Sequence, residues 1–238
     1  TETQLMRLLS NSPLQVNITL ISTESYQPTH INANHLNKFY KTFSEVKDRK
    51  FDGMIITGAP VETLPFEEVK YWDELKEIFD YANKNVTSTL YICWGAQASL
   101  YYNYGINKVL LKEKIFGVFE HIKESPLDFL LKGFNDYFYI PQSRHTGLDE
   151  AALRNTKELE VLASSEKSGI AIVKSKNGRQ IFITGHLEYD AVTLSNEYER
   201  DLSKGLDIKP PQNYYKDDGT INMCWKSTAT LFFTNWLN

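Results

Sequence analysis

The chain has 238 residues, of which 42% are hydrophobic and 13% aromatic, so it is long enough to bury a substantial core in one large domain. Its formal net charge of −4 provides no basic stripe, which argues against nucleic acid or an anionic membrane surface as the main partner. No apolar run approaches the roughly 18 residues that span a bilayer, and two widely separated cysteines form no disulfide framework; we therefore expect a cytoplasmic protein.

Strand-like and helix-like segments alternate through the first half of the chain, which predicts an α/β fold with a mainly parallel central sheet flanked by helices. The expected elements are a strand over 14–21, a short helix over 35–40, a buried strand over 52–58, a helix over 66–83, a strand over 87–93 and a helix over 96–104.

Short strand-like segments dominate the second half, over 117–119, 137–140, 159–163, 170–174 and 180–185. Asn177-Gly178 separates the last two and predicts a tight turn, so we expect an antiparallel ribbon that returns to the sheet. A closing helix over 227–237 is rich in aromatic residues. Because no internal repeat or flexible linker interrupts the pattern, we expect residues 1–238 to form a single domain.

Cys93 is the first candidate for chemistry, because it stands at the turn between the expected strand over 87–93 and the helix that follows. A thiol at a helix N-terminus lies near the positive end of the helix dipole and near free backbone N–H groups, which favour the nucleophilic thiolate. A buried structural cysteine is the alternative, and Cys93 alone does not separate the two.

His186 and Glu188 form the second candidate site, where the apolar segment over 181–184 leads into Gly185. In open α/β sheets, sites form at the loops that follow the carboxyl ends of strands. His186 is therefore the natural general base for Cys93, and Glu188 is placed to orient the imidazole. A core histidine and a solvated loop carboxylate are the alternatives.

Backbone N–H groups that could stabilise an oxyanion form the third candidate site. The turn Thr57-Gly-Ala-Pro60 ends a buried strand, and the loop that it opens can present one N–H, which we assign to Glu62. The N–H of Trp94, the residue after the proposed nucleophile, would be the other donor. An ordinary loop is the alternative.

These motifs follow one another in the order found in the class I glutamine-amidotransferase-like superfamily, and within it the chain resembles the homoserine O-acyltransferase (homoserine transsuccinylase) family. The resemblance rests on the runs over 8–16, 51–60, 86–90, 93–97, 143–145, 184–186, 188–190 and 234–238. It implies a flavodoxin-like fold with a nucleophile elbow, and a homodimer. The family normally begins with an additional segment that bears the first strand, and we expect a sheet without that strand here.

The resemblance implies ping-pong acyl transfer in methionine biosynthesis, with acyl-CoA and a small hydroxy amino acid as substrates. Cys93 would carry the acyl group as a thioester, and His186, held by Glu188, would deprotonate the acceptor hydroxyl. The expectation includes no metal and no resident cofactor, since acetyl-CoA acts as a co-substrate.

The family pattern also aligns Lys114, Ser143 and Arg200 with substrate-contacting positions. Arg200 is suited to bind the acceptor's carboxylate through two parallel hydrogen bonds, whereas Lys114 supplies a compact positive charge. Without the resemblance, both cations would be interpreted as ordinary surface salt-bridge partners.

Glu62 bears on the acyl donor, because in this family the position just after Gly-Ala-Pro-Val helps to select it. A small residue there leaves room for the carboxylate of a succinyl group, whereas a glutamate fills the space and repels that charge. We therefore expect an acetyl donor. A glutamate that points to solvent is the alternative.

Several departures from the family pattern leave the acceptor open: Leu187 replaces the usual proline, Gln142 the usual histidine, and Lys226-Ser-Thr-Ala-Thr230 a more common Arg-Ser-His run. L-Serine O-acetyltransferase is one alternative activity, because serine and homoserine differ by only one methylene. Homoserine O-succinyltransferase, which uses the other acyl donor, is a second alternative. A glutamine amidotransferase with the same triad, and a binding module without activity, are the remaining alternatives.

Overall fold

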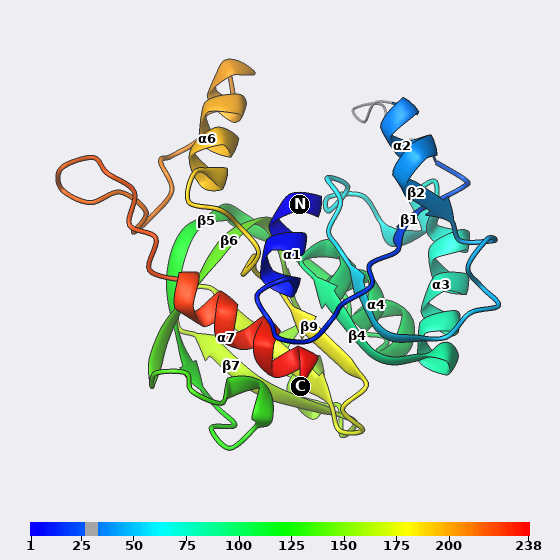
Figure 1. Cartoon of the computed structure of the whole chain (residues 1–238). Coiled ribbons are helices and arrows are strands. Elements are labelled where there is room, and N and C mark those ends of the chain that lie inside the picture. Colours follow the sequence, from blue (N-terminus) through cyan, green and yellow to red (C-terminus); the bar gives the residue numbers. More distant parts are fainter. Residues whose placement is uncertain (27–32) are drawn as a thin grey trace.

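Helices flank both faces of a central sheet in the computed structural model, which describes residues 1–26 and 33–238 (Figure 1). Within these residues the sheet has seven strands, in the order β3-β4-β9-β8-β7-β5-β6. A separate pair of parallel strands, β1 (Leu20–Ser22) and β2 (Tyr40–Thr42), lies beside α2 (Ala33–Phe39). The predicted α/β fold with a helix-flanked sheet is therefore confirmed.

One end of the sheet is parallel and contains β3 (Phe51–Ile56), β4 (Val86–Ile92) and β9 (Gln180–Ile183). A crossover through the 3-10 turn η1 (Phe66–Glu68) and α3 (Trp72–Asn85) joins β3 to β4. The last four residues of β4 are buried because helices cover the sheet on both faces, as the near-continuous apolar sequence of such a strand requires. α4 (Trp94–Tyr104) then follows β4 directly.

The other end of the sheet is antiparallel and contains β8 (Gly169–Ser175), β7 (Leu159–Ser165), β5 (Lys108–Lys123) and β6 (Tyr137–Leu148). β8 also pairs with β9 in the antiparallel sense, and a turn in which Gly178 has a φ of +76° joins the two strands. The predicted ribbon is therefore present, but the sheet as a whole is less parallel than the sequence indicates. The short turns over 166–168 and 176–179 permit only antiparallel pairing of the strands that they join.

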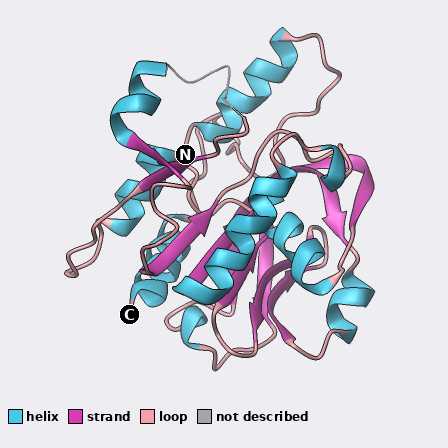
Figure 2. Cartoon of the chain, turned by 90° about the vertical axis from the view of Figure 1, so that its right-hand side faces the viewer, coloured by secondary structure: helices cyan, strands magenta, loops and turns pink. Residues whose placement is uncertain are grey.

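Helices lie against the sheet in Figure 2, and two hydrophobic layers hold them there. α1 (Glu2–Leu9), α7 (Lys226–Leu237) and the 3-10 turn η2 (Phe129–Leu131) pack on one face, around Leu90 and Phe232. α3, α4 and α5 (Glu150–Asn155) pack on the other, around Tyr91 and Phe182. α6 (Thr193–Ser203) projects beyond the sheet and buries only Leu194 and Asp201.

The structure corrects several predicted boundaries. The expected strand over 14–21 is a strand only from Leu20 onward, because most side chains over 11–19 are exposed and nothing pairs with that stretch. The helices α1, α5 and α6 were not predicted from the sequence. Within the described residues, no helix is both long enough and apolar enough to cross a membrane.

Candidate active site

Cys93 lies on a sharp turn between β4 and α4, as the sequence predicts. Its backbone has φ +53° and ψ −119°, a conformation that is rare for a residue with a side chain and that persists only where the surroundings hold it. One such restraint is the Cys93 N–H, which donates to the carbonyl of Ile183 on β9 at 2.7 Å. The turn holds Cys93 in place, and the residue is only partly buried.

Two glycines allow the loop after β3 to approach this turn closely. A Cβ on Gly95 would lie 2.7 Å from the carbonyl oxygen of Ile56, and a Cβ on Gly58 would lie 3.2 Å from the Cβ of Cys93. The same position on Gly58 is 3.4 Å from the nitrogen of Trp94, in the first turn of α4, where N–H groups have no partner within the helix. The loop predicted to supply an oxyanion donor therefore lies beside Trp94 and the thiol.

His186 follows β9 and lies next to Glu188. A side chain on Gly185 would collide with Ile140 and with the carbonyl of Pro141, at 2.6 and 2.7 Å. Glycine therefore lets the chain pass β6, and the His186 N–H donates to Pro141 at 2.8 Å. The imidazole Nδ1 is 2.7 Å from Oε1 of Glu188, and both side chains are almost fully buried.

The environment of His186 favours its protonated form. Burial lowers the pKa of the imidazole, but the charges of Cys93 and Glu188, together with hydrogen bonds to both, raise that pKa well above its ordinary value. The structure thus brings Cys93, His186 and Glu188 together in the order that a nucleophile, a base and an orienting carboxylate would require. This arrangement is suited to covalent acyl chemistry through the thiol.

Glu62 points to β6 rather than to open solvent. One of its carboxylate oxygens, Oε2, accepts a hydrogen bond from the N–H of His145 at 2.9 Å and lies 3.1 Å from the hydroxyl of Thr146. The loop after β3 is therefore tied to β6 through a negatively charged group. That charge also favours the protonated form of the buried Arg144 guanidinium, whose pKa is lowered chiefly by its burial.

Lys114 and Arg200 meet at one carboxylate. Lys114 Nζ lies 3.1 Å from Oδ2 of the buried Asp201 and 4.2 Å from the centre of the Phe116 ring. Arg200 binds the other oxygen of Asp201 through Nε and through a terminal nitrogen, at 2.9 and 2.8 Å. Burial raises the pKa of Asp201, but hydrogen bonds from Arg200 and Lys114 outweigh burial and lower it overall.

Ser143 is linked to the loop over 184–192, which carries His186, through two residues that the sequence analysis missed. Its hydroxyl donates to Oε2 of Glu197 at 2.6 Å, and Oε1 of the same carboxylate accepts from the hydroxyl of Tyr189 at 2.6 Å. The Tyr189 ring lies flat against the His186 ring. No described contact joins the cluster of Lys114 and Arg200 to Cys93 itself.

The comparisons with known proteins identify the family of the chain. The sequence profile of the family described as homoserine O-succinyltransferase matches residues 1–238. The chain is 54% identical over 241 residues to a protein of Acetivibrio thermocellus named homoserine O-acetyltransferase, covering all of this chain and 79% of that protein. The chain belongs to the homoserine O-succinyltransferase family.

Other relatives point the same way. A homoserine O-acetyltransferase of Bacillus licheniformis is 52% identical over 241 residues, with 100% of this chain and 80% of that protein covered. Among solved structures, a glutamine amidotransferase from Thermotoga maritima superposes with a TM-score of 0.59 at 14% identity, over 93% of this chain and 97% of that one. This last likeness shows that the family shares the class I glutamine amidotransferase fold.

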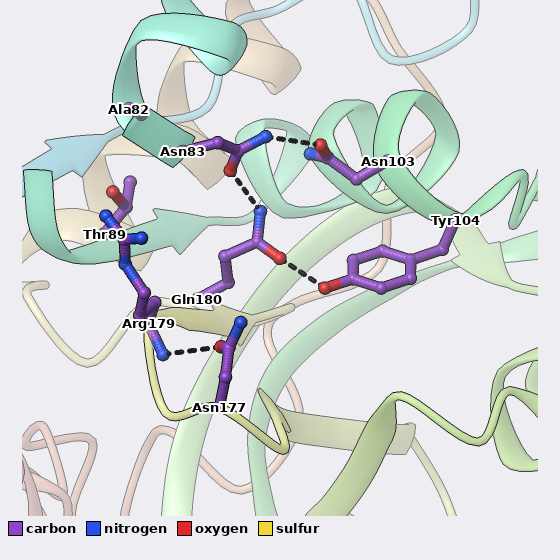
Figure 3. Close-up of a pocket in the computed structure, with 8 residues that line it drawn as sticks. All are labelled: Ala82, Asn83, Thr89, Asn103, Tyr104, Asn177, Arg179 and Gln180. Atoms are coloured by element: carbon purple, nitrogen blue, oxygen red, sulfur yellow. Dashed lines mark hydrogen bonds between the residues drawn. The ribbon is translucent and has the colours of Figure 1, made fainter. Parts of the chain in front are cut away.

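A pocket away from Cys93 has a volume of about 210 Å³ and does not resemble an active site (Figure 3). It lies at the start of β9, at the opposite end of that strand from His186. The Gln180 amide donates to Asn83 at 2.8 Å, and the Asn83 amide donates to Asn103 at 2.8 Å. The Tyr104 hydroxyl donates to Gln180. Its lining contains neither a thiol nor a carboxylate, so it offers no nucleophile comparable to Cys93.

Across residues 1–26 and 33–238, no group of three or more histidine, cysteine, aspartate or glutamate side chains is arranged to hold a metal ion.

The signal that could have revealed Glu197 is its spacing from Arg200, because residues three apart lie on one face of a helix. The role of Tyr189 depends on ring geometry, which the sequence does not contain.

Proposed function

We propose that this chain transfers the acetyl group of acetyl-CoA to the side-chain hydroxyl of L-homoserine, a step of methionine biosynthesis, through a thioester on Cys93. The observation that carries the proposal is the thiol on its strained turn beside the buried pair of His186 and Glu188. Relatives that are more than half identical over the whole chain and bear the name homoserine O-acetyltransferase support the choice of substrates.

In the first half-reaction, His186 takes the proton of Cys93 and the sulfur attacks the acetyl carbonyl carbon of acetyl-CoA. The carbonyl oxygen becomes an oxyanion, which the N–H groups of Trp94 and Glu62 stabilise. The bond from this carbon to the CoA sulfur then breaks, and His186 returns its proton to CoA, which leaves as the free thiol. Glu188 stabilises the imidazolium throughout.

In the second half-reaction, the amino acid's hydroxyl gives its proton to His186, and its oxygen attacks the thioester carbonyl. The ester forms, the carbon–sulfur bond to Cys93 breaks, and the thiol regains the proton. Arg200, Lys114 and Ser143 would bind the acceptor. Asp201 forms ion pairs with both cations, so an incoming carboxylate would share or replace that contact.

Glu62 supports acetyl as the donor group. Its carboxylate is held between the loop after β3 and β6, where it would repel the free carboxylate of a succinyl group and occupy the space that this group needs. We expect E62G to gain activity with succinyl-CoA, and E62Q, which keeps the volume but removes the charge, to gain less.

The first test is mass spectrometry of the protein mixed with acetyl-CoA alone. We expect one acetyl group on Cys93, none on C93S, and normal acetylation of C224S, the matched control at the second cysteine. Turnover with an acceptor while Cys93 stays unmodified would contradict the ping-pong scheme.

The second test pairs acetyl-CoA and succinyl-CoA with L-homoserine and L-serine, and follows the release of free CoA. The proposal expects acetyl-CoA with L-homoserine to react fastest. L-Serine is the runner-up acceptor, because one methylene is worth only about 1–3 kcal/mol of discrimination. From the family resemblance we further propose a homodimer in the cytoplasm, which light scattering and cell fractionation would test.

A further inference from the structure

Tyr189 forms a wall against one face of the catalytic imidazole. The centres of the Tyr189 and His186 rings are 4.1 Å apart, and their planes differ by 17°. Glu188 restrains His186 at Nδ1 within the ring plane, whereas Tyr189 restrains the direction perpendicular to it. The two contacts together leave the imidazole little freedom to swing.

Tyr189 is itself fixed by bonds at two distant points. Its carbonyl accepts a hydrogen bond from the indole N–H of the fully buried Trp225 at 2.9 Å, and its hydroxyl donates to Glu197 at 2.6 Å. Burial raises the pKa of the Tyr189 phenol, as does the charge of Glu197, so the hydroxyl remains a neutral donor. Because the Tyr189 ring is fixed in this way, it can restrain the position of the His186 ring that stacks on it.

We propose that Tyr189 is a positioning residue, which holds His186 at the angle required to exchange a proton with Cys93, and that Glu197 fixes Tyr189 and couples it to Ser143. For acyl transfer, this role rests on the function proposed above. A displacement of about 1 Å at a reacting group can cost on the order of a hundredfold in rate, so a wall beside the base has a large effect. Because Glu197 also holds Ser143, the acceptor side of the site shares this anchor.

The decisive comparison is Y189L against Y189F in the full-length protein. Y189L removes the aromatic face, whereas Y189F keeps it and loses only the hydroxyl. Two rates are measured: the burst of CoA released from acetyl-CoA alone, and the alkylation of Cys93 by iodoacetamide, which needs no acyl donor. Y137L, at an exposed tyrosine of β6, is the matched control.

We expect Y189L to slow the burst at saturating acetyl-CoA by roughly 10- to 100-fold without changing the half-saturating concentration, and to slow alkylation as well. Y189F loses only the bond to Glu197, so it should be slowed less than Y189L, by roughly 3- to 10-fold, whereas Y137L should match the wild type. Wild-type rates for Y189L would overturn the proposal, as would equal losses in Y189L and Y189F.

E197A covers the case in which Y189L does not fold, because it frees the hydroxyl without emptying the core. We expect a slower burst, by roughly 3- to 10-fold, with alkylation slowed in parallel; an unchanged burst would overturn the coupling through Glu197. If the wild type releases no CoA but Y189L still slows alkylation, acyl transfer is wrong and the positioning role is supported.

Discussion

At the residue scale, two buried histidines respond to pH in opposite ways because their neighbours differ. His186 faces Cys93 and Glu188, which raise its pKa despite its burial. His121 instead contacts the Phe119 carbonyl at 2.9 Å and the Ser168 hydroxyl at 3.1 Å, neither of which is charged. Burial lowers the pKa of His121 to about 4.

His121 should therefore destabilise the fold in acid. An unfolded histidine binds its proton near pH 6.5, whereas folded His121 does so only near pH 4, so the unfolded state gains protons first. Stability falls as the pH drops from about 6.5 to 4, by up to about 3 kcal/mol. Urea unfolding at both pH values should show a smaller fall for H121Q, whereas H145Q, at an exposed histidine, should behave like the wild type.

His186 contributes with the opposite sign. Because its folded pKa is raised, its stabilisation is complete below the unfolded pKa and is lost as the pH rises through the folded value. We expect E188Q to lower the pKa of His186, as NMR titration of the ring would detect, and to reduce acyl transfer by roughly 10²–10⁴-fold, by analogy with other triads. An unaltered rate would remove Glu188 from the mechanism.

At the element scale, a few polar contacts help to hold α6 near the sheet. Its buried Asp201 forms an ion pair with Lys114 of β5. Its Glu197 accepts hydrogen bonds from Ser143 of β6 and from Tyr189 of the loop after β9. Leu194 packs in an apolar cluster with Phe116 and Trp225, and the polar contacts add to that packing along the rest of the helix.

D201N should loosen α6 and weaken acceptor binding. The change leaves Lys114, whose side chain is only 13% exposed, without a charged partner in that contact, a situation that is costly for a buried cation. We expect faster amide hydrogen exchange over 193–203 and a higher KM for the acceptor. E199Q, at an exposed glutamate of the same helix, is the control; equal exchange in both variants would argue against the contact.

These elements also show what the sequence can predict. The turn at Cys93 and the loop at His186 follow apolar strands with conspicuous glycines, so their positions were evident. α6 was missed although Leu194, Tyr198 and Leu202 recur at helical spacing, because these three are the only apolar residues in an otherwise polar segment. β5 runs over Lys108–Lys123, far beyond the predicted 117–119, because lysines and an irregular pairing after Leu110 mask its alternation.

At the scale of the whole molecule, α1 lies over the loop that carries His186 and Glu188. Arg7 of α1 donates to the carbonyl of Glu188 at 3.2 Å and pairs with Asp190 at 2.9 Å, while Gln4 donates to Thr193 at 2.8 Å. α1 also packs beside α7 (Figure 1). Residues separated by more than 180 positions meet here, and no local pattern in the sequence predicts such a meeting.

R7A should therefore affect activity more than stability. Arg7 is 40% exposed in its ion pair, and surface pairs contribute about 0–1 kcal/mol. The loss of its bond to Glu188 should nevertheless free the loop and lower acyl transfer several-fold. R154A, at an arginine of similar exposure paired with Glu124, should lose comparable stability but no activity; identical kinetics for both variants would refute this role of α1.

The mixed sheet divides the labour of the proposed reaction. The thiol and the base follow strands of its parallel end, whereas Lys114 and Ser143 come from strands at the antiparallel end. An enzyme built this way can exchange one alcohol for another through changes on β5, β6 and α6 while the machinery that captures the acyl group is left intact. Redesign toward new amino-alcohol esters should start at those elements.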